Sequence, residues 1–302
     1  MSQAPALRLR DFALIALICL AWGCNFLTSA AALRELPPLM FTAMRMGVLA
    51  LALLPFLRWP PRGQWRLLIA VAICNVVLHF GTSFWSLKMA GDLASPAIVM
   101  QSYVPMAALL AWWLRGERFA WRTGLAILVS FGGILVLGFD PIVLDNPQSL
   151  ALMLVSGFFL ALGTVLMRGL TGIDLFSQQG WSAWIGLGPL LVWSTLAEPG
   201  AWSALAQTSW VGWGGAIYAA LVASLLGHGL FYRLVQSHPV AQVTPYLLFS
   251  PLVAIGLGLW FWGDRPGPRL WIGGAMVLGG VLAIALRNFA TQRVLVRDPG
   301  EI

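Results

Sequence analysis

Charged side chains are scarce in this sequence: only 10% of the 302 residues are Asp, Glu, Lys or Arg, whereas 59% are hydrophobic. The mean hydropathy is +0.83. A chain of this composition cannot keep most of its surface in water, which excludes a soluble protein. Its repeated long apolar runs predict a membrane protein that crosses the bilayer many times.

Cysteine and histidine are also few. The three cysteines, Cys19, Cys24 and Cys74, lie in apolar runs without paired spacing, so neither a disulfide framework nor a metal site is predicted, and no cofactor is indicated. A membrane enzyme would need a nucleophile with a base, or a set of metal ligands. The sequence has no His-Glu-x-x-His motif, and the Val-Ser-Gly at 155–157 lacks the preceding glycine of a Gly-x-Ser-Gly motif. These absences argue against an enzyme.

Carboxylates are absent from the middles of the apolar runs. All 11 Asp and Glu residues fall in predicted loops or near helix ends, from Asp11 to Glu301. The intramembrane acid that proton relays commonly use is therefore lacking. If a proton moves with a substrate, His79 or His228 must carry it, because the pKa of histidine is about 6.5. Otherwise the protein is a facilitator driven by the substrate gradient.

Ten apolar runs are present, each long enough to cross a hydrocarbon core of about 30 Å as a helix. They cover residues 11–33, 38–58, 65–87, 94–114, 122–139, 148–168, 175–197, 211–236, 240–262 and 270–287. The first run ends in Ser-Ala-Ala-Ala and resembles a signal peptide, but its apolar part is too long, so we expect a retained helix. The predicted fold is an all-α polytopic membrane protein with ten transmembrane helices.

The basic residues predict the orientation in the membrane. The net charge of +7 does not indicate nucleic-acid binding, since the arginines lie at the ends of apolar runs. With the N-terminus inside, the outer loops hold only Arg34, Lys88, Arg265 and Arg269. The inner segments hold Arg8, Arg10, Arg58, Arg62, Arg66, Arg115, Arg118, Arg122, Arg168, Arg233, Arg287, Arg293 and Arg297. This asymmetry predicts a bacterial-type inner membrane protein with both termini in the cytoplasm.

The two halves of the chain resemble each other. Pro105 matches Pro251 at an offset of 146, Gly116-Glu117-Arg118 matches Gly263-Asp264-Arg265 at 147, and Gly132-Gly133 matches Gly279-Gly280 at 147. Residues 1–143 and 144–302 therefore each form a five-helix repeat, and an odd number of helices inverts the second repeat relative to the first. Inverted repeats are an architecture of secondary transporters, in which the two halves exchange conformations.

Pro105 and Pro251 lie near the middles of their predicted helices. A proline there removes a backbone N–H and leaves the carbonyls of Gln101 and Leu247 without their usual partners. A packing kink is the simpler interpretation. Because both prolines occupy equivalent places, we expect a hinge or a cavity lining at each.

Several segments resemble a known family. "LAWGCNF", "LPPLMFTAMRMGVLA", "ALLAWWLRGERF" and "SFGGILVL" resemble, in order and spacing, the EamA type of the drug/metabolite transporter superfamily, and the similarity covers about 280 residues. "MAGDLASPAIVMQS" is similar to the amino-acid and metabolite exporters of that group, including aromatic amino-acid and cysteine-pathway exporters. The resemblance implies a central cavity lined by helices 1, 3, 4, 6, 8 and 9. Pro266 departs from the family pattern after Gly-Asp-Arg.

Polar residues inside the runs mark candidate binding positions. Asn25, His79 and Gln101 lie about 7 to 8 residues from the outer ends of their helices, while His228, Tyr246, Ser250 and Thr164 lie nearer the inner ends. This placement predicts an outer polar tier that the second repeat mirrors near the cytoplasm. For each histidine the plainer interpretation is a buried ring satisfied by a backbone carbonyl. The predicted substrate-binding residues are Trp22, Asn25, Phe26, His79, Ser83, Gln101, Ser102, Pro105, Phe158, Thr164, His228, Tyr246, Phe249 and Ser250.

Arg45 is the one ionised side chain well inside a run. Such a residue commonly marks function. Helix 2 is not among the cavity helices implied by the family, so we expect a structural role, tying carbonyls or reaching the outer surface, with contact to a substrate carboxylate as the alternative. Small-residue pairs, Ala275-x-x-x-Gly279 and Gly212-x-x-x-Ala216, and the Gly pairs of helices 5 and 10 predict close helix contacts, either within the scaffold or in a dimer.

The sequence thus favours a secondary transporter that exports amino acids, aromatic and other neutral ones, by alternating access. A wall of aromatic and neutral polar groups suits amphipathic zwitterions better than highly charged solutes. An exporter of drug-like or toxic hydrophobic compounds and a non-transporting receptor are the alternatives. The expected partners are the small-molecule substrate and the lipid bilayer, and the chain is expected to be a monomer or a weak dimer.

Overall fold

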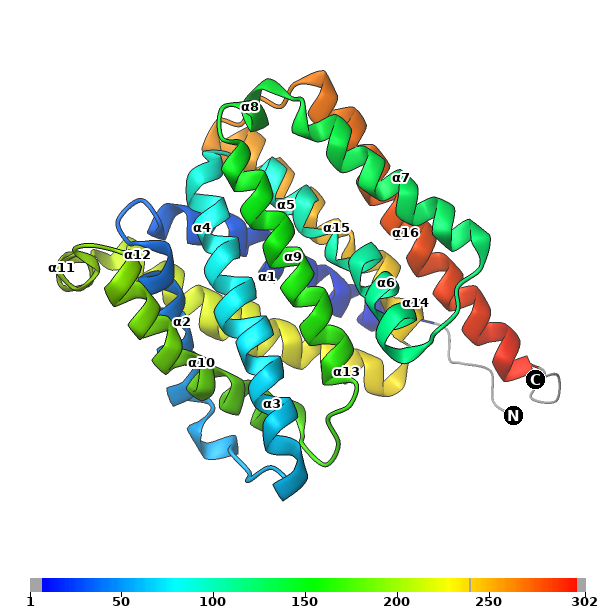
Figure 1. The fold of residues 1–302 in the computed structure, drawn as a ribbon, viewed down its shortest axis with the longest axis horizontal. Coiled ribbons are helices and arrows are strands. Elements are labelled where there is room, and N and C mark those ends of the chain that lie inside the picture. The colour runs from blue at the N-terminus through cyan, green and yellow to red at the C-terminus, as the bar shows by residue number, and fades with distance from the viewer. Residues whose placement is uncertain (1–6, 239, 298–302) are drawn as a thin grey trace.

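The computed structural model describes residues 7–238 and 240–297, and all regular structure in these ranges is helical. Figure 1 shows long helices packed side by side in one bundle. Eight helical segments are long and apolar enough to cross a membrane: Leu9–Ala32, Arg62–Ala90, Ala94–Arg115, Trp121–Gly138, Pro147–Met167, Trp210–Ser237, Gln242–Trp262 and Pro268–Arg287. These findings confirm a polytopic all-α membrane protein.

The uninterrupted helices are α1 (Leu9–Ala32), α2 (Pro38–Ala52), α7 (Trp121–Gly138), α9 (Pro147–Met167), α10 (Leu175–Ala197) and α16 (Pro268–Arg297). Helices α2 and α10 occupy the second and seventh apolar runs; α2 has 15 residues and α10 has 23. Short helical turns and connecting helices are η1 (Leu54–Phe56), η2 (Arg62–Gln64), α8 (Pro141–Leu144) and α11 (Ala201–Gln207).

Four of the predicted runs are composite. The third run contains α3 (Trp65–Ala72), η3 (Ile73–Phe80) and α4 (Gly81–Ala90), and the fourth contains α5 (Ala94–Met100) and α6 (Tyr103–Arg115). The eighth contains α12 (Trp210–Ile217), η4 (Tyr218–His228) and α13 (Gly229–Ser237), and the ninth contains α14 (Val240–Leu247), α15 (Phe249–Leu257) and η5 (Gly258–Trp262). Segments η3 and η4 are π-helical and occupy matching places in the two halves.

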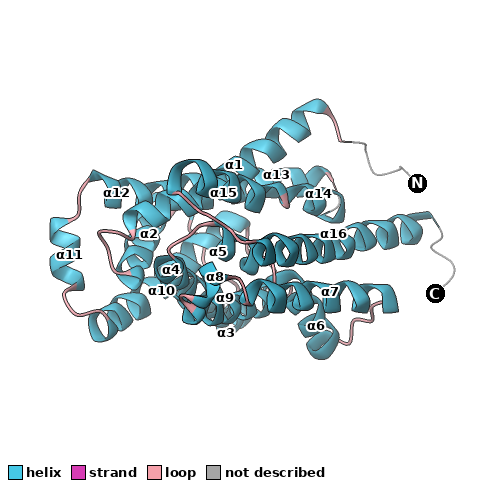
Figure 2. Ribbon diagram, turned by 90° about the horizontal axis from the view of Figure 1, so that it is seen from above, coloured by secondary structure: helices cyan, strands magenta, loops and turns pink. Residues whose placement is uncertain are grey.

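The packing follows the repeat. Helix α1 of the first half packs against α12, η4 and α15 of the second, while α9 of the second half packs against η3, α4, α5 and α6 of the first. Helices α2 and α10 pack together, as do α7 and α16, and each of these pairs joins equivalent members of the two halves. Both views show α7 and α16 side by side (Figures 1 and 2). This reciprocal exchange of partners is consistent with an inverted repeat.

Glycines allow α7 and α16 to approach closely. A Cβ atom added to Gly133 would lie 2.6 Å from the carbonyl oxygen of Gly273, and one added to Gly273 would lie 2.5 Å from that of Gly133. The Ser130 hydroxyl donates to the carbonyl of Val277 at 3.0 Å. The predicted contact between helices 5 and 10 is therefore present. The expected packing of the Ala275–Gly279 pair within the chain is wrong, because both residues lie on the exposed side of α16, and a contact with a second copy stays a prediction.

The second small-residue pair lies in a buried contact of α12. Ala216 is fully buried. A Cβ atom added to Gly212 would lie 3.2 Å from the Leu36 side chain, and one added to the neighbouring Gly215 would lie 2.6 Å from Ala32. The pair therefore lies where α12 meets the end of α1.

Both predicted proline sites coincide with helix breaks. Helix α5 ends at Met100 and α6 begins at Tyr103, before Pro105, and α14 ends at Leu247 before α15 begins, ahead of Pro251. The Gln101 carbonyl lacks its usual partner at position 105, as expected, but it accepts the Val104 N–H at 3.1 Å across the break. Hinge motion at these breaks stays a prediction.

The end of the bundle that holds the C-terminus of α1, named here the Ala32 end, carries buried carboxylates at helix N-termini. Glu198 accepts from the backbone N–H groups of Leu39 and Met40 at 2.8 and 3.0 Å, where α2 begins. Asp140 accepts the N–H of Leu270, near the start of α16, at 2.8 Å. Figure 2 shows α11 and α12 at the left, toward this end, and the first turns of α1 and last turns of α16 at the right. Acids at helix ends thus satisfy backbone donors of other helices.

Candidate functional site

The side chain of Arg45 lies inside the bundle. It is only 2% exposed, and its Nη2 atom donates to the Ser224 hydroxyl at 2.8 Å. The guanidinium carbon lies 3.9 Å above the centre of the Phe80 ring and 5.4 Å from that of Phe84. The expectation that this side chain ties carbonyls or reaches the outer surface is therefore wrong in its geometry. Arg45 joins α2 of the first half to η4 of the second.

His79, at the end of η3, is held by Ser156 of α9. The ring is 4% exposed, and its Nδ1 atom lies 2.8 Å from the Ser156 hydroxyl oxygen and 3.2 Å from the Ser156 carbonyl oxygen. The same hydroxyl donates to the His79 carbonyl at 3.0 Å. Since that hydroxyl hydrogen is already used, Nδ1 carries the ring proton and donates it to Ser156. The Nε2 atom is then the acceptor of the neutral ring.

His228 has a matching arrangement at the end of η4. Its Nδ1 atom lies 3.0 Å from the carbonyl oxygen of Ser224. Trp22 of α1 lies beside it, with ring centres 5.4 Å apart, and its indole N–H donates to the Ala223 carbonyl at 3.0 Å. Both histidines therefore direct Nδ1 at a backbone carbonyl, as the plainer interpretation of the sequence holds.

Ser224 connects these groups. Its hydroxyl accepts from Arg45 and its carbonyl contacts His228, while the charge of Arg45 also acts on the ring of His79. We name Arg45, His79, Ser224 and His228 the central cluster. The sequence places the two histidines in separate outer and inner tiers, whereas the structure links both to Arg45: His228 through Ser224, and His79 through the Phe80 ring, whose centre lies 4.6 Å from that of His79.

Asn25 is half-buried on α1 and accepts a long hydrogen bond, 3.4 Å, from Ser29 of the same helix. A Cβ atom added to Gly23, two residues earlier, would lie 2.5 Å from the Val253 side chain. Gly23 therefore allows α1 to approach α15 closely.

Other predicted site residues lie away from the central cluster or make local contacts. Ser102, at the α5–α6 break, is buried with its hydroxyl unpartnered, next to Gly157 of α9, whereas the Thr164 hydroxyl donates within its own helix. Half-buried Gln101 lies at the same break, and Pro105 follows it on α6. The Ser83 hydroxyl contacts the Met153 sulfur, and the Tyr246 ring packs against Phe12. Ser250 is buried, and Phe26 packs against the hydrophobic core. Phe158 and Phe249 are 41% and 59% exposed.

Sequence reasoning missed three polar residues that the structure places here. Ser156 and Ser224 are ordinary small residues of apolar helices, and only the fold pairs them with His79 and Arg45. Asn75 packs against Gly163 of α9, and its side-chain oxygen is buried without a hydrogen-bond partner. An amide within "ICNVV" is the same signal that singles out Asn25, so Asn75 was open to prediction.

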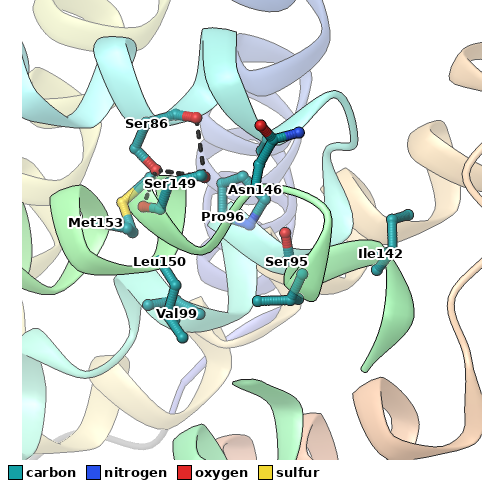
Figure 3. A pocket seen from close by; sticks show the side chains of 11 residues that line it. Ser86, Ser95, Pro96, Val99, Ile142, Asn146, Ser149, Leu150 and Met153 are labelled. Atoms are coloured by element: carbon teal, nitrogen blue, oxygen red, sulfur yellow. Dashed lines mark hydrogen bonds between the residues drawn. The ribbon is translucent and has the colours of Figure 1, made fainter. Parts of the chain in front are cut away.

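A small cavity between α4, α5 and α9 is a packing feature. In Figure 3 the Ser86 hydroxyl of α4 donates to the Ser149 carbonyl at 2.7 Å, and the Ser149 hydroxyl returns a bond of 3.0 Å to the Ser86 carbonyl. The cavity has a volume of about 10 Å³, which suits a single water molecule. It is too small for a metabolite.

Several contacts join the two halves at the Ala32 end. Asp264 accepts from the N–H groups of Leu93 and Ala94 at 2.9 and 3.1 Å, so it caps α5. The Trp262 indole donates to the Gly91 carbonyl at 3.0 Å, and the guanidinium of Arg34 lies 4.0 Å above the Trp262 ring. These contacts tie the end of η5 to the first half of the chain.

Two carboxyl groups at this end have raised pKa values. Burial raises the pKa of Asp92 to about 6. The negative charge of nearby Asp264 also raises this pKa, whereas the hydrogen bonds from Ser95 lower it. Burial also raises the pKa of Asp264, against the bonds from Leu93 and Ala94. Asp92 in the α4–α5 loop and Asp264 beside it therefore release their protons at a higher pH than exposed carboxyl groups do.

A bundle of apolar helices, two repeats that exchange equivalent helices and a polar cluster shared between them define a membrane transporter. The EamA-like transporter family matches residues 11–139 and 148–286, and the chain belongs to this family. It is thus a multi-pass protein of a bacterial inner membrane, and it is not an enzyme.

Relatives and one solved structure span nearly the whole chain. A protein of Escherichia coli named "Probable amino-acid metabolite efflux pump" is 23% identical and covers 90% of this chain and 93% of its own length. A Pseudomonas aeruginosa protein, "Uncharacterized protein PA1977", is 30% identical over 91% of this chain and 94% of its own. A crystal structure with 15% identity superposes with a TM-score of 0.62 over 95% of this chain and 99% of that one, which shows a shared fold.

Proposed function

We propose that the protein exports amino acids, aromatic and other neutral ones, and related metabolites across the inner membrane. The observation that carries this proposal is the central cluster, in which hydrogen-bonding side chains of both halves meet beside the aromatic rings of Trp22 and Phe80. Such a mixture suits a molecule with a polar head and an apolar or aromatic side chain. The name of the Escherichia coli relative supports the same class of substrate.

We further propose that α2 and α10 also cross the membrane, which gives ten spans and places both termini on one side. The asymmetry of Lys and Arg residues assigns that side to the cytoplasm, so the Ala32 end faces outward. The contacts of Asp264 and Trp262 support closure at the Ala32 end, and the ion pairs of Asp11 with His238 and of Glu117 with Arg168 also join the two halves at the opposite end. Transport by alternating access would break the contacts of one end at a time.

Flux measurements test this function directly. Purified protein is reconstituted into liposomes preloaded with one of a panel of radiolabelled solutes, and efflux is compared with that from protein-free liposomes. We expect efflux of phenylalanine, tryptophan and leucine, and little efflux of glutamate or arginine. Efflux of hydrophobic drugs without efflux of amino acids would favour the alternative exporter, and binding of amino acids without any flux would favour a receptor.

A further inference from the structure

Arg45 has more hydrogen-bond donors than partners. Its Nε and Nη1 atoms are buried and have no hydrogen-bond partner, and its one bond goes to the hydroxyl of Ser224. Within residues 7–238 and 240–297, the ion pairs found between side chains do not include Arg45. The guanidinium is therefore buried without a negative charge beside it.

This arrangement is costly for a purely structural arginine. An ion taken out of water loses its hydration, so buried charges are found paired or bonded. The ring of Phe80 below the guanidinium offsets part of that loss. A ring face does not accept from the N–H groups in the guanidinium plane, so Nε and Nη1 still need acceptors.

The guanidinium has N–H groups without acceptors, and their arrangement matches a planar anion. Nη2 has two hydrogens, and Ser224 accepts one of them. The second hydrogen of Nη2 is parallel to an N–H of one neighbouring nitrogen, Nε or Nη1, and both of these nitrogens lack partners. Two parallel N–H groups match the two oxygens of a carboxylate.

The neighbouring groups have the right character for such a ligand. The imidazoles of His79 and His228 are linked to the guanidinium through the Phe80 ring and through Ser224, and neither ring carries a negative charge. Phe80 and Phe84 provide apolar surface on one side.

We propose that Arg45 binds the carboxylate of the transported substrate through two N–H groups, while Ser224 holds the guanidinium in place. The proposal rests on the proposed function, for which it names the residue that recognises the acid group. It replaces the structural role expected from the sequence, because the bonds that such a role requires are not made by Nε and Nη1.

The first test compares phenylalanine with phenylalaninamide, which lacks the carboxylate, in the liposome assay. We expect the wild-type protein to export phenylalanine at least tenfold more efficiently. In Arg45→Gln the apparent affinity for phenylalanine should fall by about ten- to hundredfold, the usual effect of losing hydrogen bonds to a charged group, while transport of the amide changes little. Arg45→Lys should recover part of the affinity. Arg66→Gln, an exposed arginine on α3, is the matched control and should behave as wild type.

A binding measurement keeps the proposal testable if Arg45 variants fold poorly or flux is absent. The probe is 3-phenylpropanoate, with 3-phenylpropanamide as its uncharged counterpart, and the readout is the unfolding temperature of the wild-type protein in detergent. Stabilisation by the acid alone supports the proposal, even if no amino acid is exported, in which case only the proposed function fails. Equal transport of phenylalanine and its amide, or no preference for the acid in binding, overturns it while export can stand.

Discussion

At the scale of single residues, the two buried histidines raise the question of proton coupling. Each directs Nδ1 at a backbone carbonyl, so in the neutral ring Nε2 is the atom that can take up a proton. Since carboxylates are confined to loops and helix ends, these rings are the titratable groups best placed to couple a proton to the substrate.

We predict that the double variant His79→Gln and His228→Gln loses the dependence of export on a proton gradient, imposed with the pH varied from about 5 to 8. Initial rates of phenylalanine efflux measured across this range provide the check. His238→Gln is the control. His238 follows α13, at the end of that helix away from His228, and its Nε2 atom lies 3.2 Å from the carboxylate of Asp11. A double variant with the pH profile of wild type would show that export is not coupled through these rings.

Asp92 predicts how the stability of the folded protein changes with pH. Burial raises its pKa from 3.8 to about 6, so between these values the folded chain holds a proton that the unfolded chain has released. This contribution to stability is complete below about pH 4 and is lost as the pH rises through about 6. A rise of about two pKa units corresponds to roughly 3 kcal/mol.

Asp92→Asn should therefore flatten the decline of the unfolding temperature between pH 4 and pH 7 in detergent. The asparagine oxygen still accepts the Ser95 N–H, which Asp92 accepts at 2.6 Å, so the cap of α5 is kept. Asp145→Asn removes an exposed carboxyl group and is the matched control. Parallel pH profiles for wild type and Asp92→Asn would contradict the assignment.

At the scale of helices, the contact of α7 with α16 gives a pair of matched substitutions on one element. A Cβ atom at Gly273 would lie 2.5 Å from the Gly133 carbonyl oxygen, whereas one at Gly279 would meet nothing within 4 Å. Gly273→Ala should lower the free energy of unfolding by about 1–3 kcal/mol, because the backbones must separate. Gly279→Ala should be neutral or stabilising by up to about 1 kcal/mol, since alanine favours the helix. Thermal unfolding in detergent measures both, and equal effects would contradict a backbone contact.

The interruptions of the helices were only partly predictable. The prolines at 105 and 251 indicated breaks, but they did not reveal that the Gln101 carbonyl would find the Val104 N–H across the break. The π-helical segments η3 and η4 contain no proline and no glycine pair from which they could have been predicted. A wider helical turn depends on how side chains pack against neighbouring helices, which the pattern of one run does not contain.

At the scale of the whole molecule, the contacts at the Ala32 end predict a gate. A variant that lacks the two hydrogen bonds from backbone N–H groups to Asp264 should favour the state open to the outside by about tenfold. This factor corresponds to about 1.4 kcal/mol. We expect Asp264→Ala to increase the labelling rate of a cysteine at position 101 by an impermeant maleimide added from outside, in a chain without its three native cysteines.

The control for this gate is Asp140→Ala. Asp140 also binds backbone N–H groups at the Ala32 end, but it joins the loop after α7 to α16. Helices α7 and α16 pack along their length, so their relative position should not change with the gate. Similar labelling rates in the two variants would contradict a gate at Asp264, and faster labelling from the cytoplasmic side alone would reverse the proposed orientation.

The sequence by itself determined that this protein lies in a membrane, that it is helical and that it consists of two related halves. Those features depend on the length and hydrophobicity of each run, and on signposts such as Gly-Glu-Arg and Gly-Asp-Arg that recur at a constant offset. Asn25, His79 and His228 were singled out for the same reason, because a polar side chain inside an apolar run is visible without knowledge of its partners.

Only the tertiary structure decided which polar residues meet. Arg45 and Ser224 are 179 residues apart, and His79 and Ser156 are 77 apart, so nothing in the local pattern joins them. Their pairing follows from α2 packing against η4 and from α9 packing among the helices of the first half. Hydrogen bonds act over about 3 Å, whereas sequence patterns fix a helix only to within a few residues, and one residue turns a side chain by about 100°.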